Sequence, residues 1–160
     1  MLDLMTPRLL ALSIIALLVP MRAYARVGET EAQVGKRYGK AIETLRSESG
    51  VHRKYSFRAF TILVSFQNGI SAMEQYQKKD LGVITPTETI QLLTANSNGG
   101  KWTDPELTDD GDYIAHTWGN PKLIAVYHPV ARSITIASKQ FLYSATNAIN
   151  AGARKKMEGF

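Results

Sequence analysis

The stretch FTILVSFQNGISAMEQYQ (residues 60–77) indicates the fold more clearly than any other part of the chain. Large apolar residues occupy every second position from Phe60 to Phe66, which is the period of a half-buried strand. Asn68-Gly69 is a hairpin turn signal. A two-residue loop would place polar residues opposite this apolar face. Burial therefore favours a three-residue loop, Gln67-Asn68-Gly69, with the pairs Val64–Ala72 and Phe60–Tyr76.

The residues before this hairpin predict one short helix and little else. Thr30-Glu31-Ala32-Gln33 forms a capping box, so we expect a helix that ends at Tyr38, before Gly39. Residues 43–52 show no period and are interpreted as a loop. Tyr55, Phe57 and Ala59 alternate in the opposite phase to the strand that follows, which predicts a bulge near Ala59-Phe60.

After the hairpin, Thr85-Pro86 begins a second helix, and we expect Ile90 and Leu93 on its inner face. The acidic stretch at residues 104–112 is interpreted as a loop. Three further strands are expected at residues 113–118, 123–127 and 133–138, followed by a helix at residues 140–151. The strand register that gathers the apolar residues on one face pairs Trp118 with Leu123 and Tyr127 with Ile134.

The order of these elements predicts the fold class α+β. We expect an antiparallel sheet, made from a hairpin and a three-strand meander, with helices packed on one face. The two helix-then-strands halves resemble a diverged duplication in outline, although no residue-level repeat is visible.

The N-terminus has the layout of a secretory signal. An apolar run at residues 9–21 is followed by Ala23-Tyr24-Ala25, which offers the small residues that a signal peptidase requires. The alternative is a retained membrane anchor, but a spanning helix needs about 20 apolar residues and Arg22 interrupts the run first. We expect residues 1–25 to be cleaved, residues 26–152 to form a single domain, and residues 153–160 to be a frayed basic tail.

The composition excludes several classes of protein. The chain contains no cysteine, so disulfides, thiolate metal sites and thiol nucleophiles are absent. The net charge of +5 comes from scattered Lys and Arg residues. A nucleic-acid-binding protein would gather them on one face. We expect a periplasmic or secreted protein with no stable membrane anchor, no nucleic-acid partner and no cofactor.

No pattern in the sequence assembles a catalytic or metal site. His116 and His128 lie too far apart to share a metal ion, and the acidic loop lacks the closing glutamate of a calcium-binding loop. Glu74 is predicted to point inward, where it could be an active-site acid or an ion-pair partner. The sequence therefore favours a non-enzymatic protein, and His116 and Glu74 are the residues around which an unrecognised site could form.

One feature favours binding instead. The strand faces opposite the helices should be polar, yet they carry several large apolar residues. A second packed layer is the alternative explanation, and the usual one for such residues. A loop tryptophan after two glycines is a further candidate contact. The predicted interaction surface consists of Leu63, Met73, Trp102, Tyr113, Ile124 and Val126.

Two short motifs carry a resemblance to a known family. EAQVGKRYGK (residues 31–40) followed by TILVSFQNG (residues 61–69) resembles the small outer-membrane-assembly domains of the SmpA/OmlA family. The order of helices and strands is also similar to β-lactamase-inhibitor-like modules. The resemblance implies an envelope domain that binds an envelope or extracellular protein, and it transfers no functional residue. A hydrolase with an unrecognised site and a small-ligand carrier are the alternative functions.

Overall fold

The computed structural model describes residues 26–47, 50–111 and 114–147. The expected leader at residues 1–25, the expected tail at residues 153–160 and the end of the expected terminal helix lie outside them. The described chain contains two capped helices, α1 (Glu31–Tyr38) and α2 (Pro86–Ala95), and a third helix over residues 139–147. The strands are β1 (Glu43–Ser47), β2 (Gly50–Phe57), β3 (Phe60–Gln67), β4 (Ile70–Lys78), β5 (Glu106–Asp109), β6 (Ile114–Gly119), β7 (Leu123–His128) and β8 (Ser133–Ser138).

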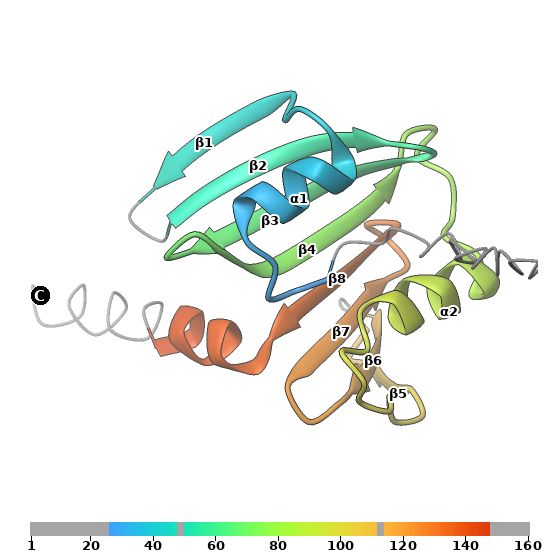
Figure 1. Ribbon diagram of the computed structural model, residues 1–160. Coiled ribbons are helices and arrows are strands. Elements are labelled where there is room, and N and C mark those ends of the chain that lie inside the picture. Colours follow the sequence, from blue (N-terminus) through green and yellow to red (C-terminus); the bar gives the residue numbers. More distant parts are fainter. Residues whose placement is uncertain (1–25, 48–49, 112–113, 148–160) are drawn as a thin grey trace, which may run out of the picture.

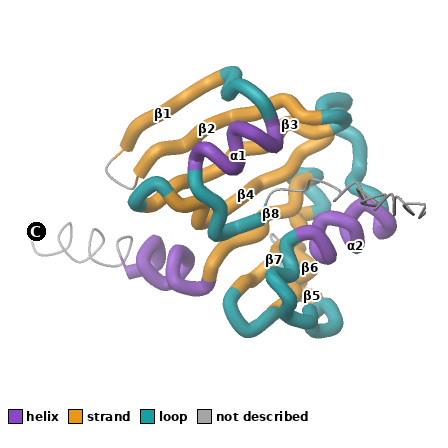
Figure 2. The backbone as a smooth tube through the Cα atoms, viewed as in Figure 1, coloured by secondary structure: helices purple, strands orange, loops and turns teal. Residues whose placement is uncertain are grey.

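The eight strands form one antiparallel sheet in the order β1-β2-β3-β4-β8-β7-β6-β5. The described chain has two halves, and in each half a helix is followed by four consecutive strands. The two halves join where β4 pairs with β8. Helices α1 and α2 lie on the same face of the sheet (Figures 1 and 2). The core lies between these helices and the sheet, and the predicted α+β class with an antiparallel sheet is confirmed.

Two segments that were expected to be loops are strands. Residues 43–52 contain β1 and the start of β2, and the acidic stretch contains β5. Every residue of β1 and β5 is exposed, so neither strand shows the alternation by which a half-buried strand is recognised. The predicted bulge near Ala59-Phe60 is also wrong. Phe57 pairs with Phe60 across a two-residue turn, and this turn reverses the phase of the alternation.

The register of the central hairpin differs from the prediction by two residues. Asn68 and Gly69, both with positive φ, form a two-residue turn, and Ala72 is an extra residue that creates a bulge in β4. Val64 therefore pairs with Glu74, and Tyr76 pairs with Ile62 rather than with Phe60. A shift of two residues keeps the side chains after the bulge on their predicted face. Before the bulge the shift is one residue, so Ser71 pairs with Phe66 and is buried, whereas Ile70, expected there, is 41% exposed.

The second half of the sheet shows the same kind of shift. Tyr127 pairs with Ile134 as predicted, whereas Trp118 pairs with Ala125 instead of Leu123. The inner face of α2 also differs, because Ile90 is 63% exposed while Thr89, Leu92 and Leu93 are buried.

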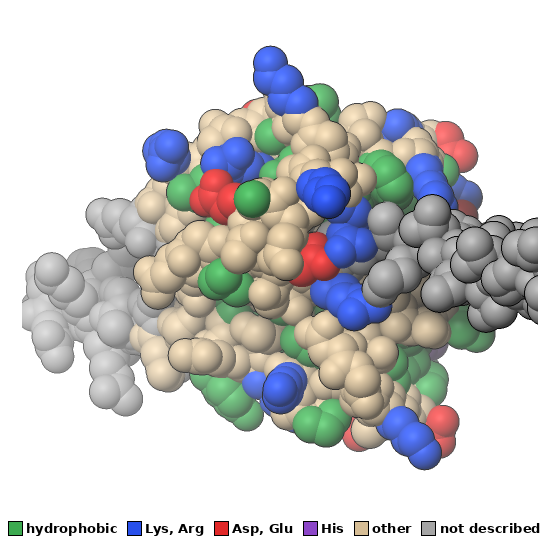
Figure 3. Space-filling model, viewed as in Figure 1, with side chains coloured by type: hydrophobic (Ala, Val, Ile, Leu, Met, Phe, Trp, Pro, Cys, Tyr) green, Lys and Arg blue, Asp and Glu red, His purple; other side chains and the backbone are tan. Residues whose placement is uncertain are grey.

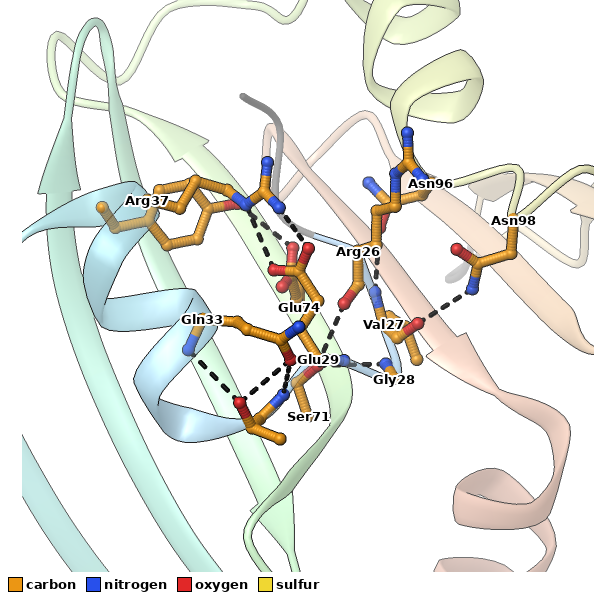
Figure 4. Close-up of polar contacts among 12 residues, drawn as sticks. Arg26, Val27, Gly28, Glu29, Gln33, Arg37, Ser71, Glu74, Asn96 and Asn98 are labelled. Atoms are coloured by element: carbon orange, nitrogen blue, oxygen red, sulfur yellow. Dashed lines mark hydrogen bonds and ion pairs between the residues drawn. The ribbon is translucent and has the colours of Figure 1, made fainter. Parts of the chain in front are cut away.

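The segment before α1 joins the two halves. Gly28 N–H donates to the Ser71 carbonyl at 2.7 Å, and Val27 N–H donates to Asn96 Oδ1 at 3.2 Å, which connects this segment to both β4 and the end of α2 (Figure 4). Asn98 Nδ2 also donates to the Val27 carbonyl at 2.9 Å. These bonds connect the segment before α1 both to the sheet and to the end of α2. They therefore help to fix the position of α2 over the second half of the sheet.

Candidate functional site

A groove lies between α2 and the inner face of β6 and β7. It has a volume of about 730 Å³ and is open to solvent on one side. Its walls come from α2, β6 and β7 and from the segments that precede α2 and β5. The lining residues are Val83, Ile84, Pro86, Thr89, Ile90, Leu93, Thr94, Trp102, Thr103, Asp104, Pro105, His116, Trp118 and Tyr127.

Three rings from neighbouring sheet positions form the floor of the groove. His116 and Tyr127 are directly opposite each other on β6 and β7, with ring centroids 6.3 Å apart and planes inclined by 26°. Trp118, two residues further along β6, places its ring 6.3 Å from that of His116. Residues two apart in a strand point to the same face, which is why these side chains meet.

The wall next to this floor is fixed by hydrogen bonds. The Trp102 indole Nε1 donates to the Leu93 carbonyl at 2.7 Å, so the ring is held against the C-terminal turn of α2. Thr103 N–H donates to the Gly119 carbonyl at 2.8 Å, and Gly119 N–H donates to Thr103 Oγ1 at 3.0 Å. This wall is therefore fixed both to α2 and to the end of β6.

At one inward position α2 carries a smaller residue than α1, and this difference leaves room for the groove. Val34 and Tyr38 follow the capping Thr30 by four and eight residues, and the corresponding residues after Thr85 are Thr89 and Leu93. In the first half, the Tyr38 ring packs 5.5 Å and 5.2 Å from the rings of two residues on β2, Tyr55 and Phe57. In the second half, the aromatic rings of the sheet face the groove instead of a helix side chain of that size.

The rim of the groove carries exposed apolar side chains. Val83 is 58% exposed and Ile90 is 63% exposed, and both line the groove. Leu107 of β5, 62% exposed, pairs with His116 and so projects from the same face of the sheet. Exposed apolar residues gathered at one place are typical of an interaction site.

The predicted interaction surface is divided between two faces. Trp102 lies in the groove, whereas the other described members lie on the sheet face opposite the helices and are half-buried. On that face, two polar residues on β4 and β8, Gln75 and Thr135, separate Leu63 from Val126. Met73 and Ile124 flank Ala137 in the neighbouring row. Tyr113 lies outside the described residues.

Glu74 and His116 do not come together. His116 lines the groove, while Glu74 is fully buried beneath α1 and does not line it. The hydroxyls of Tyr38 and Tyr76 both donate to Glu74 Oε2, and among the described residues none donates to Oε1. Burial raises the pKa of Glu74 to about 7, although the two tyrosine hydrogen bonds act to lower it. This arrangement is a buried polar network inside the core, away from the groove.

The sequence predicted where several of the groove residues lie, but it did not predict the groove itself. His116, Trp118 and Tyr127 were predicted on the apolar face of the meander, which is correct, and that pattern is equally typical of a packed core. Within the described ranges, no three His, Asp or Glu side chains gather in an arrangement that could hold a metal ion. Lys and Arg side chains are scattered over the helix-bearing face (Figure 3). No helix among the described residues has the length and apolar character to span a membrane.

Comparisons with known proteins add little to this geometry. No protein-family model matches the chain, and no curated protein matches it. One similar solved structure is a cysteine-rich secretory protein from Staphylococcus aureus, with a TM-score of 0.46 and 9% sequence identity. The alignment covers 72% of this chain and 46% of that one, so this chain spans less than half of the length of that protein.

Proposed function

We propose that this protein is an exported, non-enzymatic binding module that holds an extended segment of a protein partner in the groove between α2 and β6–β7. The observation that carries the proposal is an open groove with aromatic rings on its floor and exposed apolar residues on its rim. A volume of about 730 Å³ is within the range of ligand-binding sites.

The rim residues favour a protein segment as the ligand. A small molecule would be covered by the groove alone, whereas the exposed Leu107 extends the apolar surface from the rim residues Val83 and Ile90 onto β5. Covering one such side chain contributes about 1.5 kcal/mol or more. A chain segment that crosses the groove and continues over β5 would cover all three. A small-ligand carrier, the alternative, would leave Leu107 exposed.

Export is supported by the sequence rather than by the groove. The apolar run at residues 9–21 and the motif Ala23-Tyr24-Ala25 are typical of a cleaved leader. A chain without cysteine folds identically in oxidising and reducing surroundings. We propose that the module acts in the periplasm or outside the cell, on an envelope or extracellular protein.

The two tryptophans provide a direct test, because both Trp102 and Trp118 line the groove and the chain contains two in all. A randomised peptide library displayed on phage is selected on the immobilised protein, and enriched peptides are then titrated while tryptophan emission is recorded. We expect saturable binding that shifts the emission, since the bound peptide excludes water from the indole rings.

Two matched variants locate the binding surface. Ile90→Lys places a charge on the groove rim and is expected to weaken binding about tenfold. Ile42→Lys makes the same change at a residue of equal exposure, 61%, next to β1 at the far edge of the sheet, and should leave binding unchanged. Ile124→Lys tests the opposite face. Binding that is lost only with Ile124→Lys would show that the partner uses that face and that the groove proposal is wrong.

A further inference from the structure

The groove has an electrostatic character that differs from the rest of the chain. The sequence contains 19 Lys and Arg residues against 14 Asp and Glu residues, yet the lining of the groove includes neither Lys nor Arg. Asp104 is the acidic residue among the lining side chains, and it is exposed. The groove therefore offers a carboxylate, and neither lysine nor arginine, to whatever it binds.

The aromatic floor adds to this preference. The faces of Trp and Tyr rings carry partial negative charge and attract Lys and Arg side chains, each contact contributing about 0.5–1 kcal/mol at an exposed site. The rings of Trp118 and Tyr127 are both neighbours of the His116 ring in the floor. Trp102 lies in the groove wall, two residues before Asp104 in the chain. A cation in the groove would meet aromatic rings and a carboxylate together.

The strand next to the groove extends the same charge. Asp109 of β5 is exposed and pairs with Ile114, which lies two residues before His116 in the chain, so Asp109 projects from the same sheet face as the groove floor. Lys101 is the basic residue of the segment before β5, and it precedes Trp102 without lining the groove. A partner segment that leaves the groove over β5 passes the carboxylate of Asp109.

We infer that the segment bound in the groove carries a lysine or arginine side chain, which lies over the aromatic floor and interacts with Asp104. This inference rests on the proposed function and names the chemistry of the partner: an extended peptide with apolar residues and a cationic residue between them. Acidic segments are attracted to the basic chain as a whole but are disfavoured in the groove.

The test uses three synthetic pools of short, end-blocked peptides. Each pool is randomised over leucine, phenylalanine, valine, threonine and serine, and the pools differ in the central residue, which is lysine, glutamine or glutamate. Binding to the purified protein is followed by tryptophan emission. We expect the lysine pool to bind roughly three- to tenfold more tightly than the glutamine pool, and the glutamate pool to bind weakest.

Asp104→Asn should reduce the preference for lysine over glutamine by about half or more without weakening the glutamine pool. Glu43→Gln removes one negative charge at the opposite edge of the sheet and should leave the preference unchanged. Equal binding of the three pools would overturn the inference while leaving the groove as a peptide site. The absence of binding by every pool and every displayed peptide would overturn the proposed function itself.

Discussion

Tyr38 and Leu93 occupy the same position in their helices, eight residues after the capping threonine, but they have opposite effects on the surface beneath them. The Tyr38 ring packs on the aromatic residues of β2 and its hydroxyl reaches Glu74. Leu93 is buried as well, yet it is too small to cover the rings of β6 and β7, and the groove remains. The residue at this helix position thus differs between the half that holds the groove and the half in which Tyr38 packs on the sheet.

Leu93→Tyr should therefore close the groove. The larger side chain is expected to occupy the space above the aromatic floor and to weaken peptide binding at least about tenfold, at a cost in stability of no more than about 1–3 kcal/mol. Tryptophan emission measures the binding, and circular dichroism confirms the fold. Ile42→Tyr, which adds the same ring at an exposed position far from the groove, is the control. Undiminished binding by a folded Leu93→Tyr protein would place the binding site elsewhere.

Glu74 should make stability depend on pH in an unusual direction. Because burial raises its pKa from 4.5 to about 7, the folded state holds a proton that the unfolded state has released. The stabilisation is complete below pH 4.5 and is lost as the pH rises towards 7, by an amount on the order of 3 kcal/mol.

Glu74→Gln isolates this effect, since the amide keeps the shape of the protonated acid and does not titrate. Urea unfolding of both proteins at a series of pH values from acid to neutral gives the free energies of unfolding. The difference between the two proteins should grow as the pH rises. Parallel curves would show that the carboxyl group titrates alike in the folded and unfolded states.

The sequence predicted the parts of the fold in which one strand face is buried. Alternation from Phe60 to Phe66 and in the meander identified the correct faces, because helices cover one side of the sheet. The alternation did not identify the register, because a shift of two residues leaves every side chain on the same face and so gives the same alternating pattern. The pairs Val64–Glu74 and Trp118–Ala125 depend on turn length and on the bulge at Ala72.

Neither the edge strands of the sheet nor the groove could be predicted from the sequence, and the reason differs between the two. Strands β1 and β5 are exposed on both faces, so their charged residues resemble those of a loop. The groove depends on the distance between α2 and the sheet, which follows from the packing of Thr89 and Leu93 in three dimensions. Trp102 was singled out as a contact, but the sequence could not show that it faces Trp118 and Tyr127 rather than Leu63 and Met73.

The capping box of α2 gives a prediction with an internal control. Thr85 Oγ1 accepts a hydrogen bond from Glu88 N–H at 3.2 Å and donates to the Glu88 carboxylate at 2.9 Å. Thr85→Ala should lower the free energy of unfolding by about 1 kcal/mol. Thr87→Ala, the same substitution at an exposed position two residues later, should change it by less than about 0.5 kcal/mol.

The same variant should change the titration of Glu88. Partial burial acts to raise the pKa of Glu88, but hydrogen bonds from Thr85 and the Lys78 ion pair outweigh it and hold the pKa below its usual range. Removing the Thr85 hydroxyl should raise this pKa, which an NMR titration of the side-chain carboxyl measures. An unchanged pKa would assign the shift to Lys78 and to the Thr85 backbone N–H.

Asn96 connects three parts of the molecule through a fully buried side chain. Its Oδ1 accepts from Val27 N–H, and its Nδ2 donates to the Leu92 carbonyl at 3.1 Å and to the Tyr76 hydroxyl at 3.3 Å. Asn96→Ala would leave the Val27 N–H buried without an acceptor, and an unmatched buried group costs about 1–3 kcal/mol in addition to the bonds lost. We expect the free energy of unfolding to fall by about 2–4 kcal/mol in urea titrations.

Asn98→Gly is the appropriate comparison, because it removes a single hydrogen bond to the Val27 carbonyl at a residue whose φ of 48° suits glycine. It should cost about 1 kcal/mol. If both variants unfold at the same urea concentration, the buried amide contributes no more than a surface bond does. A larger loss for Asn96→Ala, together with weaker peptide binding, would mean that the N-terminal segment fixes the position of α2, and with it the width of the groove.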